Sequence, residues 1–249
     1  MGAGDDRATI LLELAWTGSF WFPGDGRDAL LGLLPLEGSF VNAVPWIILG
    51  FFSGSLPFSL WLGRLLLHTD IRQYGDGNPG ATNALRAGGL GVGMAAYFLD
   101  IFKGALPVAL AYQVFGVRGP GMFLAALAPP LGHAFSPFLG WKGGKALAVI
   151  LGTWIGLTLY EMPAVILIQL VFWTLLLTVD GWSVLLTTLG SAAYLLFFKP
   201  DPLLLAILAG HAALVIWKHR LDLRRRPGLK PRARRWLQKI GLASNQDRT

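Results

Sequence analysis

The feature that most constrains this chain is a series of seven apolar runs between residues 44 and 217. They cover residues 44–62, 94–116, 120–139, 146–160, 162–179, 182–198 and 202–217. A helix that crosses a bilayer needs ~20 predominantly apolar residues, and several of these runs hold only 15 to 18. The series predicts an all-α fold, a polytopic membrane bundle of about seven transmembrane helices, with six as the alternative count.

The composition supports a bilayer as the solvent. Hydrophobic residues make up 54% of the chain and charged residues only 14%, against roughly 25% charged in an average soluble domain. The 32 glycines fit this interpretation, because glycine lets membrane helices approach closely. Cysteine is absent, which excludes disulfides, Cys-ligated zinc and a thiol nucleophile.

The net charge of +7 is concentrated at the C-terminal end. Eleven of the 21 Lys and Arg residues lie in the last 32 residues, directly after an apolar run. This placement indicates a tail on an anionic membrane leaflet, and nucleic-acid binding is not expected. The positive-inside rule places the N-terminus outside and the C-terminus in the cytoplasm.

Three parts are expected along the chain. Residues 1–42 carry six of the fourteen acids and the turn-rich Pro23-Gly24-Asp25-Gly26, with no basic region ahead of an apolar core. They predict a non-cytoplasmic or interfacial extension and not a cleaved signal peptide. A membrane domain over 43–220 and a basic cytoplasmic tail over 221–249 follow.

Two glycine-rich polar segments are candidates for anion binding. Residues 74–93 read YGDGNPGATNALRAGGLGVG, in which seven glycines alternate with amide, hydroxyl and guanidinium donors. Glycine lets backbone N–H groups converge on an anion, although a flexible linker is the alternative. Residues 132–145 read GHAFSPFLGWKGGK, where two lysines flank two glycines. A turn with lysines reaching to the membrane surface explains one lysine, and a phosphate cradle explains the Gly-Gly pair.

Two further features involve ionisable residues near or within the apolar runs. His219, in WKHRLDL at 217–223, suits phosphate binding, proton transfer or a polar helix end. Asp100 and Lys103 share one face of a span, and a buried pair that fixes helix packing is the favoured interpretation. No His-x4-Asp motif, Gly-x-Ser-x-Gly elbow or metal-ligand spacing is present in the sequence.

These segments together resemble the PlsY family, the bacterial membrane glycerol-3-phosphate acyltransferases that use acyl phosphate. The resemblance covers about residues 45–228. It is carried by GSLPFSLWLGR (54–64), DIRQYGDGNPGATNALR (70–86), DIFKGALPV (100–108), GHAFSPFLGWKGGK (132–145) and KHRLDL (218–223).

The resemblance implies transfer of a fatty acyl group from acyl phosphate to the sn-1 hydroxyl of glycerol 3-phosphate, giving lysophosphatidic acid and phosphate. It makes residues 43–220 an acyltransferase domain in a bacterial plasma membrane, with seven helices, no metal and no cofactor. A monomer is expected. By resemblance, Arg86, Lys145 and His219 are catalytic and hold the glycerol-phosphate anion. Asn78, Thr82 and the Gly143–Gly144 backbone would lie near the acyl phosphate. The remaining substrate-binding candidates are Asp76, Asn83, Lys142, Ser183 and Asp222.

Two departures from the family pattern add negative charge. Asp76 stands where the family usually has Ser, and Asp222 where it usually has Asn. Like charges ~6 Å apart at an effective dielectric near 20 repel by a few kcal/mol. Either Arg86 and Lys145 absorb these acids, or the chain is a divergent member with another hydroxyl or amine acceptor, or with lost activity. A transporter of a phosphorylated solute is the alternative from another class.

Overall fold

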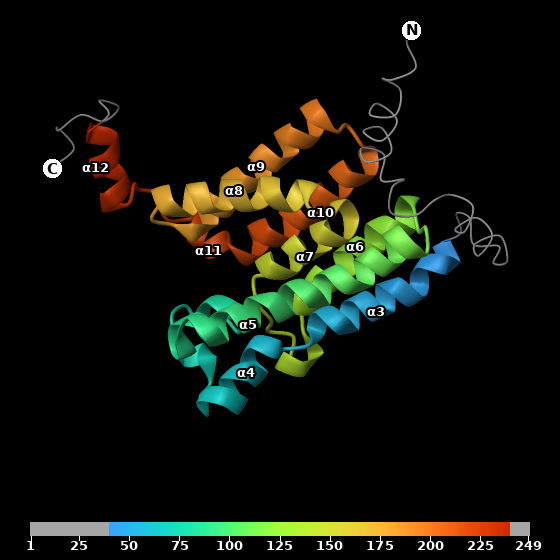
Figure 1. Ribbon diagram of the computed structural model, residues 1–249, viewed down its shortest axis with the longest axis horizontal. Coiled ribbons are helices and arrows are strands. Elements are labelled where there is room, and N and C mark those ends of the chain that lie inside the picture. Colours follow the sequence, from blue (N-terminus) through green and yellow to red (C-terminus); the bar gives the residue numbers. More distant parts are fainter. Residues whose placement is uncertain (1–39, 240–249) are drawn as a thin grey trace, which may run out of the picture. The chain divides into compact units, whose positions relative to one another are not determined.

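The computed structural model describes residues 40–239, and helices joined by loops make up this part of the chain (Figure 1). The longer helices are α3 (Val44–Ser55), α4 (Phe58–Leu67), α5 (Ala81–Ala109), α6 (Gly119–Ala134), α7 (Leu147–Thr158), α8 (Glu161–Leu176), α9 (Asp180–Phe198), α10 (Pro202–Lys218) and α12 (Pro231–Lys239). Short helical elements join them: η1 (Phe40–Ala43), η2 (Ile71–Gln73), η3 (Leu110–Val114), η4 (Pro137–Leu139) and α11 (Arg220–Leu223).

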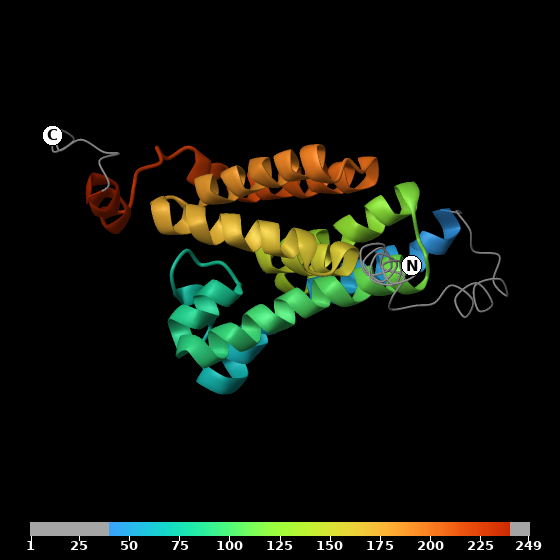
Figure 2. The same cartoon turned by 45° about the horizontal axis from the view of Figure 1, so that its top comes forward.

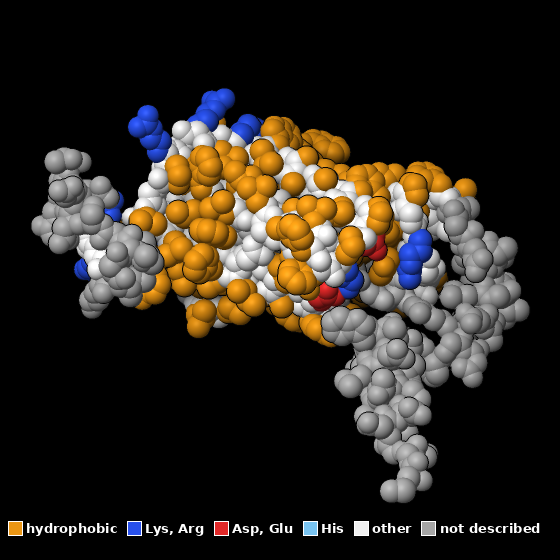
Figure 3. Space-filling model, turned by 90° about the horizontal axis from the view of Figure 1, so that it is seen from above, with side chains coloured by type: hydrophobic (Ala, Val, Ile, Leu, Met, Phe, Trp, Pro, Cys, Tyr) orange, Lys and Arg blue, Asp and Glu red, His pale blue; other side chains and the backbone are white. Residues whose placement is uncertain are grey.

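The membrane character of the bundle is evident in its helices. Within the described residues, four helical stretches are long and apolar enough to cross a bilayer: Phe40–Leu67, Ala81–Val114, Gly119–Leu139 and Asp180–Phe198. Three shorter apolar helices are α7, α8 and α10. The predicted all-α membrane bundle is confirmed, whereas the count of seven spans stays a prediction. Figure 3 shows one face of the molecule largely covered by hydrophobic side chains, as a surface in contact with lipid requires.

Two boundaries differ from the sequence expectation. The first predicted span, 44–62, is interrupted between α3 and α4 at Leu56 and Pro57, because proline has no N–H for the helical ladder. The glycine-rich segment 74–93 is a loop only as far as Gly80, where α5 begins. Residues 81–93 belong to α5 despite their four glycines, and the helix is kinked at Gly89. Arg86 therefore projects from a helix and not from a loop.

Most of the predicted N-terminal extension, 1–42, lies outside the described residues. The chain divides into two units, Met1–Ser39 and Phe40–Thr249. Within the second unit, residues 40–43 form η1 and run directly into α3. The predicted tail holds most of α11 and all of α12, and residues 240–249 again lie outside the described part.

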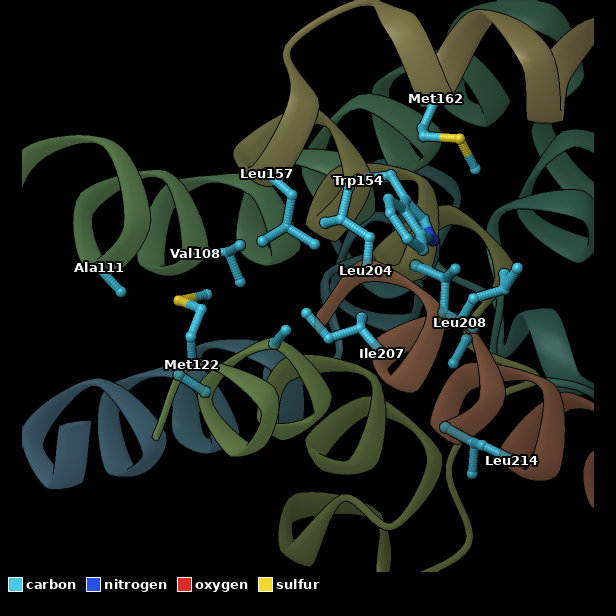
Figure 4. Close-up of a cluster of buried hydrophobic side chains, with 14 of the residues drawn as sticks. Val108, Ala111, Met122, Trp154, Leu157, Met162, Leu204, Ile207, Leu208 and Leu214 are labelled. Carbon is cyan, nitrogen blue, oxygen red and sulfur yellow. The ribbon is translucent and has the colours of Figure 1, made fainter. Parts of the chain in front are cut away.

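The helices pack as two groups joined by α6, which contacts both α3 and α10, and by α7. Figures 1 and 2 show α8, α9 and α10 together on one side and α3, α4 and α5 on the other. α7 packs against both α5 and α8. The core between them is apolar, with Trp154, Ile207 and Met122 fully buried (Figure 4). α3 crosses α6 closely because Gly54 and Gly132 have no side chains: a Cβ on either would lie 2.0 Å from a backbone oxygen of the other helix.

An ion pair lies within the bundle, as the sequence predicted. Lys103 Nζ is 2.8 Å from Asp100 Oδ1, and the two side chains are only 1% and 2% exposed. Ser59 donates a hydrogen bond to the second carboxylate oxygen of Asp100, and Lys103 donates to the Leu56 carbonyl at the break between α3 and α4. The pair thereby fixes α5 to that break.

Candidate active site

A polar cavity of about 450 Å³ lies at the end of the bundle where α4, α11 and α12 are found (Figure 1). Four chain segments form most of it: the loop before α5 with its first turns, the start of α7, the α8–α9 turn, and the α10–α11 junction. Tyr97 and Asp100 from the middle of α5 and His133 from α6 complete the lining. Eight of the twelve predicted site residues line this cavity: Asp76, Asn78, Thr82, Asn83, Arg86, Lys145, His219 and Asp222. The tertiary structure thus brings together residues that are up to 146 positions apart, from 76 to 222.

Asn83 holds the loop before α5 in shape. Its amide nitrogen donates to Asp76 Oδ1 and to the Asn78 carbonyl, each at 2.9 Å. Its amide oxygen accepts from Arg86 at 3.0 Å. Asn83 is 1% exposed and both ends of its amide are bonded. It therefore positions Asp76 and Arg86 and has little capacity left to contact a substrate.

Lys145 is bound by both of the unusual acids. Its Nζ lies 3.1 Å from Asp76 Oδ2 and 2.9 Å from Asp222 Oδ2. Burial lowers the pKa of Lys145, but hydrogen bonds to Asp222 and Asp76 outweigh this, and the net pKa is raised. Burial raises the pKa of Asp76, because it disfavours the charged carboxylate. The hydrogen bonds from Lys145 and from the backbone N–H of Asn78 outweigh this effect, and the net pKa of Asp76 lies below its ordinary value. Lys145 and Asp76 are therefore both charged at neutral pH.

His219 is buried at the C-terminal end of α10, with 2% exposure. Its Nδ1 lies 3.0 Å from the Val215 carbonyl, which can only accept, so Nδ1 carries the proton and Nε2 is an acceptor in the neutral ring. Burial lowers the pKa of His219, and the charge of Lys145 lowers it further. The imidazole is therefore neutral at pH 7 and suited to accept a hydrogen bond from a hydroxyl group.

The Gly143–Gly144 pair faces α6 and does not line the cavity. The Gly143 and Gly144 N–H groups donate to the carbonyls of Ala134 and His133 at 3.2 and 3.1 Å. A Cβ on Gly143 would lie 1.9 Å from the His133 carbonyl oxygen, and one on Gly144 would lie 2.2 Å from His133 Nε2. These two glycines are thus explained by close packing. Their predicted role near acyl phosphate stays a prediction.

The two remaining predicted residues also lie off the cavity lining. Lys142 is exposed on the turn before Gly143. Ser183 is fully buried in the first turn of α9, and its hydroxyl has no hydrogen-bond partner in the described structure. The predicted substrate contacts of Lys142 and Ser183 stay predictions.

Sequence reasoning missed several residues of this region, among them Tyr97, Arg225 and Lys218. Tyr97 lines the cavity from α5 and shares a 2.7 Å hydrogen bond with Thr82. Arg225 lines it from the tail. Lys218 Nζ donates to the Ala134 and Gly143 carbonyls at 2.8 and 3.1 Å and so ties α10 to the glycine pair. Lys218 lies in the KHRLDL segment beside His219 but was given no role, and Arg225 was visible only as a member of the basic tail, in which no signal separates it from its neighbours.

An apolar cavity of about 320 Å³ adjoins the polar one. The two cavities share five lining residues: Tyr97, Leu147, Ala148, Leu170 and Val184. The apolar cavity continues between α5, α7, α8, α9 and α10 to Trp154 and His211. A molecule with a charged head and a hydrocarbon chain can therefore place its head in the polar cavity and its chain among the helices.

A polytopic helical bundle in which a polar cavity lined by Arg86, Lys145 and His219 adjoins an apolar one suits a membrane acyltransferase. The family model described as glycerol-3-phosphate acyltransferase matches residues 44–226, and the chain belongs to this family. The resemblance to the PlsY family is thereby confirmed.

Relatives and solved structures agree with this assignment. Proteins named glycerol-3-phosphate acyltransferase are 39% identical in Bacillus velezensis over 182 residues and 34% identical in Maridesulfovibrio salexigens over 183 residues. Each alignment covers 72% of this chain and 91% of the relative. The crystal structure of PlsY in its glycerol 3-phosphate form superposes with a TM-score of 0.67 and 25% identity, covering 81% of this chain and 94% of that one. The lysophosphatidic acid form, at 24% identity and a TM-score of 0.65, shows the same fold.

Proposed function

We propose that this chain transfers a fatty acyl group from acyl phosphate to glycerol 3-phosphate, giving lysophosphatidic acid and phosphate in phospholipid synthesis. The observation that carries the proposal is the junction of the two cavities, where Arg86, Lys145 and His219 lie next to space for a hydrocarbon chain. Relatives named glycerol-3-phosphate acyltransferase and a PlsY structure in its glycerol 3-phosphate form support this acceptor.

The reaction needs no covalent enzyme intermediate. The acceptor hydroxyl oxygen bonds to the acyl carbonyl carbon, and the bond between that carbon and the phosphate oxygen breaks. The hydroxyl proton leaves with the phosphate. A chain without cysteine suits this direct transfer, and catalysis then rests on positioning and on charge stabilisation by donors fixed in the site.

Arg86 and His219 take different roles in this scheme. Arg86 is anchored through Nη1 to Asn83, which leaves the other guanidinium donors to bind a phosphate. A neutral His219 presents Nε2, which binds a hydroxyl proton and not a phosphate oxygen. We infer that His219 orients the acceptor hydroxyl for attack. This role replaces the one expected from the resemblance, in which His219 binds the glycerol-phosphate anion.

The two acids leave room for a second acceptor class. Because Lys145 already contacts both Asp76 and Asp222, only one of its three N–H donors remains for a phosphate, which would then lie beside two carboxylates. An acceptor bearing hydroxyl groups or an amine would instead bind the carboxylates directly. The double pairing of Lys145 is the observation that favours this alternative.

The orientation in the membrane follows from charge. Arg64, Arg72, Arg86 and the basic tail belong to the segments that build or adjoin the polar cavity end. The positive-inside rule places this end at the cytoplasmic face of a bacterial plasma membrane, with the N-terminus outside. Soluble glycerol 3-phosphate would then reach the site from the cytoplasm. A monomer contains every residue of this scheme.

Purified protein in vesicles tests the proposal directly. Palmitoyl phosphate is supplied with and without glycerol 3-phosphate, and released phosphate and lysophosphatidic acid are measured. Equal amounts of both products, dependent on the acceptor and lost in Arg86→Ala, are expected. Lys199→Gln is the matched control, because it removes a basic residue that pairs with Glu161 away from the cavity. Phosphate release that ignores glycerol 3-phosphate but responds to glycerol or an amino alcohol would favour the second acceptor class. No acyl transfer to any acceptor would refute the proposal.

A further inference from the structure

The tail in which the family match ends is fastened to the wall of the polar cavity. The match ends at residue 226, and residues 224–230, the tail strap, lead from α11 into α12. The Thr178 N–H donates to the Gly228 carbonyl at 2.9 Å, and the Gly228 N–H donates to Thr178 Oγ1 at 3.1 Å. Leu177 and Leu229 form an antiparallel bridge. The strap thus pairs with the α8–α9 turn as a short two-stranded contact.

The strap also completes the end of α8. The last carbonyls of a helix have no partner within it. The Lys230 N–H donates to the Leu176 carbonyl at 2.8 Å, and its ammonium donates to the Thr174 carbonyl at 2.6 Å. Thr174, Thr178 and Arg225 all line the polar cavity. The strap therefore holds the backbone of this cavity wall through hydrogen bonds at residues 174, 176 and 178.

The element beyond the strap suits a negatively charged membrane surface. Residues 224–239 contain eight basic residues and no acid. In α12 the side chains of Arg232, Arg235 and Trp236 are exposed, whereas Ala233 is buried. Basic residues beside an exposed tryptophan on a short amphipathic helix favour the interface of a bilayer with anionic head groups.

We propose that α12 binds anionic phospholipid at the cytoplasmic surface and, through the tail strap, holds the α8–α9 wall of the polar cavity in its working position. The lipid binds the docked tail better than the released tail, and this difference in affinity shifts the equilibrium toward the docked state. Acylation is then faster in membranes rich in anionic lipid. The effect on rate rests on the proposed acyltransferase function, whereas lipid binding and strap docking do not.

Three measurements on the full chain in vesicles test this inference. Vesicles of phosphatidylcholine alone are compared with vesicles containing about three parts phosphatidylglycerol in ten. The chain has no cysteine, so Gln238→Cys gives a single site for an environment-sensitive dye on α12. Amide hydrogen exchange at Thr178 and Lys230 reports docking of the strap, and lysophosphatidic acid formation reports activity.

Anionic vesicles are expected to shift the dye emission, slow exchange at both amides and raise the acylation rate several-fold, with all three effects weakened by salt. Arg232→Gln with Arg235→Gln should weaken lipid binding about five-fold for each arginine. Arg118→Gln with Lys199→Gln removes the same charge from the loop before α6 and from the α9–α10 loop. This control variant should respond to anionic vesicles as the unaltered protein does. Thr178→Val should retain the dye shift but lose the slowed exchange and the rate increase.

Amide exchange that is independent of lipid charge would overturn the coupling even where the dye responds. Inorganic phosphate alone reproducing all effects would show that no membrane surface is needed. Slowed exchange without any acyl transfer would support the lipid-bound strap while refuting the acyltransferase function.

Discussion

The Lys145 ammonium lies 2.9 Å from Asp222 and joins the start of α7 to α11, two segments 77 residues apart. The same ammonium lies 3.1 Å from Asp76 in the loop before α5. One lysine therefore connects three of the four segments around the polar cavity. Its two partners, Asp76 and Asp222, place two negative charges in a cavity that is proposed to bind phosphate.

Removal of the two acids should improve binding of glycerol 3-phosphate. Asp76→Ser combined with Asp222→Asn frees Lys145 and removes repulsion of a few kcal/mol at ~6 Å. We expect the KM for glycerol 3-phosphate to fall by about one to two orders of magnitude, measured by initial rates of lysophosphatidic acid formation. Asp180→Asn is the control, because Asp180 lines the same cavity but forms no ion pair with Lys145 in the described structure. An unchanged KM in the double variant would mean that neither carboxylate meets the acceptor.

The acid side of the pH profile should report His219. Its pKa lies below that of free histidine, about 6.5, because the ring is buried near Lys145. The neutral ring is thus fully present above that pH and becomes protonated as the pH falls through the lowered value. We expect kcat/KM to decline in acid with a midpoint below 6.5. Substrate phosphates titrate near the same pH, at about 6, so His219→Gln is compared with identical substrates. An acid limb unchanged in His219→Gln would assign it to the substrates.

Substitution of the glycine pair should destabilise the protein. Gly144→Ala places a Cβ 2.2 Å from the His133 ring, and forcing extra volume into a packed site costs about 1–3 kcal/mol. The thermal unfolding midpoint in detergent is expected to fall by several degrees. Gly91→Ala is the control, because a Cβ there meets nothing within 4 Å and the backbone needs no positive φ. Normal stability of Gly144→Ala with lost activity would instead support a direct role in binding acyl phosphate.

Removing one partner of the buried Asp100–Lys103 ion pair should destabilise the protein more than removing both charges. Lys103→Met leaves Asp100 buried without its cation, which costs about 3–5 kcal/mol. Lys103→Met combined with Asp100→Asn removes both charges and should recover much of that loss. Denaturant unfolding in mixed micelles measures the difference. A double variant as unstable as Lys103→Met would show that the ion pair itself, and not the isolated charge, governs stability.

Much of the fold followed from local properties of the sequence. The apolar runs predicted most helices, because residues that leave water for lipid must form helices to satisfy their backbones. Pro57 and the helix hidden in residues 81–93 were missed. A proline inside an apolar run does not alter hydropathy, and glycines that would weaken a soluble helix are tolerated where neighbouring helices need close contact.

The candidate site divides in the same way. The sequence alone indicated the residue types of the site and their match to the family pattern. Eight of the twelve predicted residues line one cavity. Only the tertiary structure decided that Lys145 takes both acids, that His219 is held by Val215, and that Gly143 and Gly144 pack on His133. These are contacts between segments far apart in sequence, and no local signal specifies which charge meets which. Hydrophobicity acts on each residue alone, whereas ion pairing and close packing depend on where the folded chain places the partner.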